Sequence, residues 1–122
     1  VSVHPSLAAG VALPSAAADW VLGAITEIVP ANHILTNYLI QMVVIETMDK
    51  DGVFELVLYY GAADVEVARV RFSFIGGFYG NAVYRMPSAL IPGSSRIRAQ
   101  LACSTGLAAA ANATISLVYR VF

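Results

Sequence analysis

The sequence predicts an all-β domain: an antiparallel two-sheet sandwich of jelly-roll or Greek-key type, with seven or eight strands and an extended N-terminal arm. From Trp20 onward, short runs rich in Val, Ile, Leu, Tyr and Phe recur at roughly ten-residue spacing. Gly, Pro, Asn and Asp, which favour tight turns, separate these runs. Strands without a helical layer bury their apolar faces by packing two sheets together. An immunoglobulin-like sandwich is the alternative, but the chain lacks the Cys-Trp-Cys framework of that fold.

The first 18 residues are predicted to form the arm, because they differ in composition from the rest of the chain. They are rich in Ala, Ser, Pro and Gly, and Pro5 and Pro14 would interrupt a helix. Free coil of this kind would be unusually apolar, so we expect the arm to lie along a neighbouring subunit, with a flexible terminus as the alternative. Residues 19–122 then form a single β-sandwich domain. The aliphatic side chains that would make the contacts of the arm are Val3, Leu7, Val11 and Leu13.

Two strands are predicted before the first hairpin. Residues 20–29 form an apolar run that ends at Pro30, and Trp20 at its start is expected to anchor the junction of arm and sandwich. Residues 37–47 are apolar on both faces and are interrupted only by Gln41. A strand of this kind is covered on both sides. We therefore expect the core on one side and the arm, a loop or another subunit on the other.

The remaining five strands complete the predicted set. Apolar and polar side chains alternate through 53–60, 67–75 and 95–103, so each of these strands has one face in the core and one face in water. Residues 82–87 form a short strand, and residues 113–121 form the last one. Turn sequences that contain Gly, Asp or Pro separate most of these segments.

The hairpin formed by the first two of these five strands has a defined register. Opposite residues of an antiparallel pair share a face, so the core-facing residues meet only if the loop has an odd number of residues. Pairing Tyr60 with Glu66 leaves the loop 61–65 and places Glu55 opposite Arg71, with a second arginine next along that face. We expect an ion pair that keeps this face soluble and in register, worth about 1 kcal/mol at most.

The composition predicts that some apolar surface contacts another protein. Apolar residues make up 58% of the chain and charged residues 12%, against usual values of about 45–50% and about 25%. This balance excludes intrinsic disorder and is unusual for a solitary soluble domain. Every apolar run is interrupted before it reaches the roughly 20 residues of a membrane-spanning helix. The net charge of −1 provides no basic surface for nucleic acid, so we expect neither a membrane nor a nucleic acid as partner.

Candidate catalytic and metal-binding groups are few. His4 lies in the expected arm and His33 in a turn, so no recognisable spacing places either beside a nucleophile. The single cysteine, Cys103, cannot form an internal disulfide, and no Cys/His spacing resembles a zinc site. Asp49 and Asp51 lie in a segment that a β-turn explains without a metal. We therefore expect no catalytic residues, no enzymatic activity, no cofactor and no metal site.

Aromatic and arginine side chains are further candidates for contact with a partner. Phe78 and Tyr79 lie between glycines, where they are either packed on the sandwich or presented outward. Arginine outnumbers lysine six to one, and the planar guanidinium suits protein interfaces. An ordinary solvated sheet face is the alternative for these arginines. Besides the four aliphatic residues of the arm, the candidate interface residues are Trp20, Phe78, Tyr79, Arg96 and Arg98.

The C-terminal third, residues 86–122, resembles a pattern found in bacteriophage virion proteins. A Pro-Gly pair is followed by small polar residues, an Arg-Ile-Arg-Ala strand, a Thr-Gly loop and a last strand that ends in an aromatic residue. The similarity extends over residues 20–122, because earlier segments resemble the same group. These segments are 20–23, 27–32, 54–61 and 67–72.

The resemblance implies a small β-sandwich in a tailed-phage particle, and within it a head decoration (cement) protein. Proteins of this group often assemble as trimers over the junctions of the capsid. The implied partners are other copies of this chain, as a homotrimer, and the major capsid protein. The implied location is the capsid surface of the virion, after synthesis in the host cytoplasm. A tail-fibre or baseplate module that binds a host receptor or glycan is the alternative.

Overall fold

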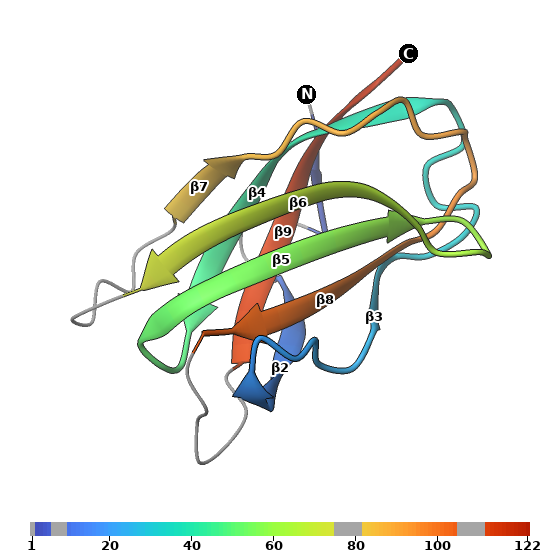
Figure 1. The fold of residues 1–122 in the computed structure, drawn as a ribbon. Helices are drawn as coiled ribbons and strands as arrows, with labels where there is room; N and C mark the ends of the chain where they lie inside the picture. The colour runs from blue at the N-terminus through green and yellow to red at the C-terminus, as the bar shows by residue number, and fades with distance from the viewer. Residues whose placement is uncertain (1, 6–9, 75–81, 105–111) are drawn as a thin grey trace.

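The computed structural model describes residues 2–5, 10–74, 82–104 and 112–122, and this part of the chain contains nine β-strands and no helix (Figure 1). The all-β prediction is confirmed, with more strands than the seven or eight expected. In chain order the strands are β1 (Ser2–His4), β2 (Val11–Asp19), β3 (Thr26–Val29), β4 (Tyr38–Met48), β5 (Gly52–Tyr60), β6 (Val65–Phe74), β7 (Ala82–Arg85), β8 (Ile97–Cys103) and β9 (Asn112–Val121).

The strands form two sheets that pack face to face, as the sequence predicts. In the first, which we call sheet A, the order is β7-β4-β9, and β1 and β2 follow one another along the other edge of β9. In the second, sheet B, the order is β6-β5-β8, and β2 and β3 share the other edge of β8. Figure 1 shows sheet B in front, with β5 and β6 crossing over β4 and β9.

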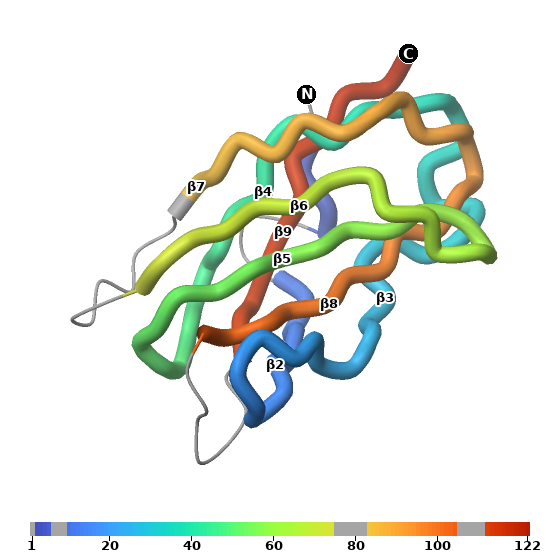
Figure 2. The backbone as a smooth tube through the Cα atoms, viewed as in Figure 1, coloured from blue at the N-terminus to red at the C-terminus, as the bar shows by residue number. Residues whose placement is uncertain are grey.

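Strand β2 belongs to both sheets and connects them at one side of the sandwich (Figure 2). Residues 11–14 pair with β9, and the second half, from Ser15, pairs with β8. The second pairing is parallel, which corrects the prediction of an entirely antiparallel sandwich. The physical reason is that β2 already runs antiparallel to β9 and keeps its direction when it crosses to sheet B, where β8 runs the same way.

Most of the predicted arm is therefore part of the sandwich. Residues 2–4 pair with β9, and residues 11–19 pair first with β9 and then with β8. Leu13 is fully buried in the core of its own chain, so it does not face a neighbouring subunit. Without these two strands, β8 and β9 would expose unpaired backbone groups along one edge. The expected boundary at residue 18 consequently does not separate an arm from a domain.

Only the end of the predicted strand 20–29 is a strand, β3. Trp20 has a left-handed φ of 53°, and its amide donates to the carbonyl of Cys103 at 2.6 Å. Gly23 lies so close to β2 that a Cβ atom there would be 2.3 Å from the carbonyl oxygen of Pro14. The first part of the segment is thus a loop held against the middle of β2 and the end of β8, and regular pairing resumes at β3.

The predicted register of the β5–β6 hairpin is confirmed over most of its length. Glu55 lies opposite Arg71, and the core-facing residues of the two strands lie opposite each other. A bulge near the turn then shifts the register by one residue, so that Tyr60 pairs with Val65. The connecting turn is therefore 61–64, one residue shorter than predicted, because two of its residues take a left-handed conformation that closes it tightly.

The core lies between the inner faces of the two sheets. Phe72 of sheet B has its ring centre 5.7 Å from that of Phe54 and 5.8 Å from that of Phe74. The same ring lies 5.2 Å from Tyr84 of β7, so it joins the two sheets. The inward sides predicted for β5, β6 and β8 are confirmed by the buried side chains. The largest fully buried ones are Tyr38, Phe54, Leu13, Ile40, Ile45, Leu56, Leu58, Met86, Ile91, Ile97, Leu101 and Ile115.

Strand β4 is apolar on both faces, as predicted, but its outer side is only partly covered. Bulges after Ile40 and after Ile45 shift its register against β9, and both of these residues face the core. Of the apolar residues on the outer side, one is buried and two are half-buried. These outer residues are Val44, Leu39 and Met42.

Candidate interaction surface

The outer face of sheet A is built largely of apolar side chains. In an antiparallel ladder, opposite residues share a face. Met42 lies opposite Arg85 on one side and Val118 on the other, and Val44 lies opposite Val83. Their chain neighbours belong to the core or pack against it, so these side chains point outward. We call this surface the apolar outer face; its apolar residues are Val3, Leu39, Met42, Val44, Val83, Val118 and Phe122.

Two side chains of the apolar outer face are strongly exposed, and other residues of the same face line a hollow. Val83 in β7 is 54% exposed, and Phe122, after the end of β9, is 61% exposed. The other five apolar residues of this face are half-buried or buried. Single exposed apolar residues are normal, whereas apolar residues gathered on one sheet face are typical of a surface that contacts another molecule. A cavity of about 420 Å³ opens at the first bulge of β4. It is lined by Leu39, Ile40, Gln41, Met42, Arg85, Pro87 and Ser88.

Two arginines on this face have no carboxylate partner. Arg85 lies opposite Met42, and the guanidinium carbon of Arg120 lies 5.5 Å from the centre of the Phe122 ring. All eight carboxylate side chains of the sequence fall within the described residues, and none is within ion-pair distance of either arginine. Both guanidinium groups can therefore bind an acidic partner.

Glu46 lies near this face but is already used inside the chain. Its Oε1 accepts a hydrogen bond from the Ser116 hydroxyl at 2.7 Å, and its Oε2 accepts one from the Gly10 amide at 2.9 Å. A Cβ atom at Gly10 would lie 2.7 Å from the same carboxylate, so residue 10 is too close to Glu46 to carry a side chain. The two bonds fasten the start of β2 to sheet A.

The outer face of sheet B has the opposite character. Glu55 binds Arg69 at 2.6 Å and Arg71 at 2.7 Å, and Arg69 also binds Glu66 at 2.7 Å. Hydrogen bonds from Arg71 and then Arg69 hold the pKa of Glu55 below its usual value. The ion pair predicted from the hairpin register is thus confirmed. We call this surface the ion-paired outer face, because its charges neutralise one another within the chain.

Arg96 and Arg98, two predicted contact residues, hold the β5–β6 turn in place. Arg98 forms a bidentate ion pair with Asp64, in which its Nε donates to Asp64 Oδ1 at 2.8 Å. This hydrogen bonding lowers the pKa of Asp64. Arg96 donates to the carbonyls of Gly61 at 3.2 Å and Ala62 at 3.3 Å. Both side chains therefore serve a contact inside the chain, on sheet B and away from the apolar outer face.

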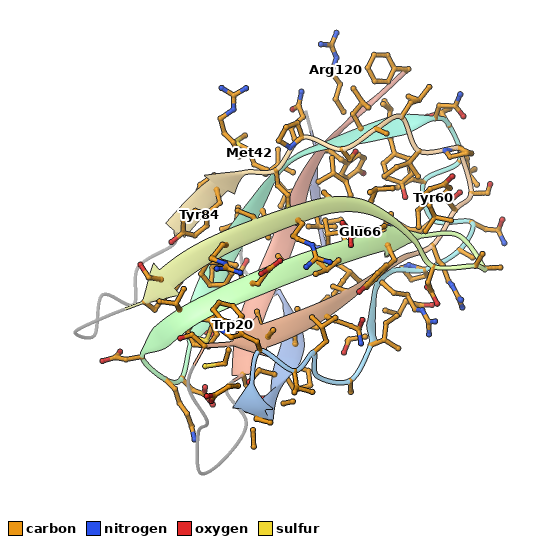
Figure 3. The ribbon with its side chains drawn as sticks, in the orientation of Figure 1. Trp20, Met42, Tyr60, Glu66, Tyr84 and Arg120 are labelled. Atoms are coloured by element: carbon orange, nitrogen blue, oxygen red, sulfur yellow. The ribbon has the colours of Figure 1, made fainter. Side chains whose placement is uncertain are left out.

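The other predicted contact residues are distributed over several places. Val3 lies on the apolar outer face, whereas Val11 packs against the core. Trp20 is 41% exposed, and the guanidinium of Arg71 lies 4.2 Å from the centre of its ring (Figure 3). Three predicted residues lie outside the described part of the chain: Leu7, Phe78 and Tyr79.

Most residues of the apolar outer face were not predictable as contact residues from the sequence. The run 37–47 was the one indication of this face in the sequence. It is apolar on both sides, so the side away from the core was also expected to be covered. Arg85 and Arg120 could not be separated from the arginines of sheet B, because a single sequence does not reveal which strands become neighbours.

His4 and His33 form a contact between β1 and the turn that precedes β4. Their ring centres lie 4.5 Å apart in an edge-to-face arrangement, and His4 Nε2 donates to the carbonyl of Ile28 at 3.0 Å. Burial and, to a smaller extent, the charge of His33 lower the pKa of His4, while the bond to Ile28 opposes this shift. The neutral form of His4 is therefore the one that the fold favours.

We expect acid to weaken this contact. The unfolded chain takes up a proton at His4 more readily than the folded chain does. The free energy of unfolding should therefore fall as the pH drops below about 6.5, and it should level off below the lowered pKa. Thermal unfolding between about pH 8 and about pH 5 should show a decrease in Tm that the His4→Gln variant lacks. If Tm decreased with pH equally in the wild type and in His4→Gln, burial would not lower the pKa of His4.

Further features of the described residues concern metal, membrane and thiol chemistry. Among them, no group of three or more His, Cys, Asp and Glu side chains is placed to hold a metal ion. No helix of sufficient length and apolarity to cross a membrane is found in the same part of the chain. Cys103 is buried and forms no disulfide.

No protein-family model and no curated protein matches the chain. Among solved structures, it is similar to a chain of infectious bursal disease virus, Gx strain, with 19% identity, a TM-score of 0.42, and coverage of 94% of this chain and 30% of that one. A chain of the T13 particle of infectious bursal disease virus is 18% identical, with a TM-score of 0.39, and the match covers 91% of this chain and 31% of that one. An arabinose-bound α-L-arabinofuranosidase is 13% identical, with a TM-score of 0.39, and the match covers 85% of this chain and 18% of that one. The chain thus spans less than a third of each, and no family or function follows from similarities of this size.

Proposed function

We propose that this protein is a non-enzymatic structural component of a virus particle: a decoration (cement) protein that binds the assembled head of a tailed phage. The apolar outer face is its assembly surface. The proposed partners are the major capsid protein and other copies of this chain. The proposed location is the outer surface of the capsid.

The observation that carries the proposal is the difference between the two outer faces. The ion-paired outer face neutralises its charges within the chain, whereas the apolar outer face leaves Val83, Phe122 and two unpaired arginines in contact with water. Burying apolar area is worth roughly 25 cal/mol per Å², and a folded monomer does not gain this from its exposed side chains. Met, aromatic and Arg side chains are enriched at protein interfaces, and among its valines the apolar outer face carries Met42, Phe122 and the two unpaired arginines.

The rigidity of the sandwich supports the same role. Strands β7, β4 and β9 hold the side chains of the apolar outer face in fixed positions, so docking costs little conformational entropy. A protein that binds the assembled shell and not its free subunits stabilises the shell by mass action. The resemblance of residues 20–122 to phage virion proteins supports the choice of a phage head among possible assemblies.

Phage heads assembled without this protein provide the test. The wild-type protein is expected to bind these heads, but not free coat subunits, and to raise the temperature at which the heads break. Val83→Asp places a carboxylate beside Arg85. This carboxylate must lose its hydration when the face docks, and it can form an ion pair with Arg85 that competes with the partner. We expect this variant to bind heads at least about tenfold more weakly.

Ser73→Asp is the matched control, because Ser73 is an exposed residue of the other edge strand and lies on the ion-paired outer face. It is expected to bind heads as the wild type does. Equal binding by the two variants would contradict the assembly surface. Heads that resist heat equally well with and without the protein would contradict decoration, and antibody labelling at the tail would favour the receptor-binding alternative.

A further inference from the structure

We infer that copies of this chain associate head to tail, with the apolar outer face of one copy against the loop between β2 and β3 of the next. The inference rests on the proposed function, because it names the occupant of the proposed assembly surface. That surface offers apolar side chains and two unpaired guanidinium groups. A complementary partner must therefore offer apolar side chains together with carboxylates, and the chain itself presents such a surface.

The segment that joins β2 to β3, taken together with the strand ends on either side, is both apolar and acidic. It begins at Asp19, the last residue of β2, and runs to Glu27 in β3. Both carboxylate residues are exposed. We call residues 19–27 the acidic loop. Its exposed large apolar residues are Trp20, Val21 and Ile25.

The carboxylates of the acidic loop match the unpaired arginines. All seven Lys and Arg side chains fall within the described residues, and none of them forms an ion pair with Asp19. Glu27 lies opposite Arg98, which already pairs with Asp64. Contact between the acidic loop and the apolar outer face would give Arg85 a counterion and would bury apolar side chains on both sides.

One copy cannot make this contact with itself, because the two surfaces lie on different sides of the molecule. The acidic loop follows β2 and leads into β3, at the edge of sheet B, whereas the apolar outer face spans β7, β4 and β9 of sheet A. Figure 3 shows Trp20 well away from Met42 and Arg120. Two different surfaces that meet between copies form a heterologous contact, which repeats as a closed ring or as an open chain.

The acidic loop is ordered before any contact forms. The amide of Trp20 donates to Cys103, the guanidinium of Arg71 stacks on its ring, and the amide of Gly23 donates to the carbonyl of Leu101 at 2.9 Å. An ordered loop with an exposed aromatic ring loses little entropy on binding. We place the Trp20 ring of one copy in the cavity beside Met42 of the next.

Reversing the charges of the two surfaces tests the inference. Asp19→Arg reverses the charge at the start of the acidic loop, and the double variant Arg85→Glu/Arg120→Glu reverses the apolar outer face. Each variant alone is expected to self-associate at least about tenfold more weakly than the wild type, because like charges then meet. An equimolar mixture of the two is expected to associate again, because the reversed loop of one variant meets the reversed face of the other. Size-exclusion chromatography with light scattering measures the mass over a range of concentrations.

The matched control is Asp51→Arg, the same substitution at an exposed residue of the β4–β5 turn. It is expected to associate as the wild type does, and thermal unfolding checks that every variant is folded. A wild-type chain that stays monomeric at all concentrations would overturn the inference. A mixture that fails to associate, or equal weakening by Asp51→Arg, would overturn it as well.

Failure of this inference can be told apart from failure of the proposed function. If the wild type is monomeric and Val83→Asp still abolishes head binding, the apolar outer face binds the coat directly and the head-to-tail contact is wrong. If the charge reversal behaves as expected but no heads are bound, self-association stands and the decoration function is wrong.

Discussion

Replacing Phe72 with alanine is expected to lower the free energy of unfolding by about 3–5 kcal/mol. The ring is buried, and it contacts Phe54 and Phe74 within sheet B and Tyr84 in sheet A. Its removal leaves a cavity where the two sheets meet, and side chains held on paired strands relax little into such a cavity. Urea unfolding followed by circular dichroism measures the change.

Phe122→Ala makes the same substitution at an exposed position and is expected to stay within about 0.5 kcal/mol of the wild type. Both variants are compared at a concentration at which the chain is monomeric, so that contacts between copies do not contribute. A loss below about 1.5 kcal/mol in Phe72→Ala would show that the two sheets are not joined through this ring.

Replacing Leu13 with alanine is expected to cost about 2–5 kcal/mol of folding free energy. Leu13 lies in the half of β2 that pairs with β9, opposite Ala113, and its side chain is fully buried in the core. An arm that lay on a neighbouring subunit would give no such effect in the isolated chain. Chemical denaturation of the monomer therefore separates the two interpretations of the N-terminal region.

Leu35→Ala is the matched control, because Leu35 is 72% exposed. We expect its free energy of unfolding to differ from that of the wild type by about 0.5 kcal/mol or less. If Leu13→Ala behaved like this control, the N-terminal residues would not be an integral part of the sandwich.

The two kinds of substitution act on different properties of the protein. Phe72 and Leu13 lie between the sheets, so their loss should reduce stability and leave the outer faces unchanged. Val83, Arg85 and Arg120 lie on the apolar outer face, where an isolated chain gains little from them. Their substitution should change assembly and leave folding nearly unchanged. Measuring stability and association on the same variants therefore tests the division between core and assembly surface.

The hairpin of β5 and β6 was predictable almost residue by residue. Alternation along each strand defines its inward side, and the shared face of opposite residues then sets the register, including Glu55 opposite Arg71. The bulge and the shorter turn were not predictable, because they depend on the left-handed conformations of Gly61 and Asp64 in the closed turn. Such conformations depend on contacts beyond the local sequence.

The N-terminal region and the candidate site were predicted less well. The Ala- and Pro-rich composition of residues 1–18 has no strand pattern, yet β2 forms because β8 and β9 offer open edges. The arginines illustrate the same limit. Arg98 and Arg85 both follow the alternation of a strand, but only one of them lies beside a carboxylate when the sheets assemble.

The sequence alone was sufficient to predict the all-β class and the inward side of most strands, and it shows the excess of apolar over charged groups directly. Each of these depends on near neighbours in the chain or on composition. Only the folded molecule decided that β2 joins both sheets, that one outer face is ion-paired and that the other keeps two arginines unpaired. These properties arise from pairing between segments as distant as β2 and β9, and the free energy of such pairing depends on every competing edge in the fold.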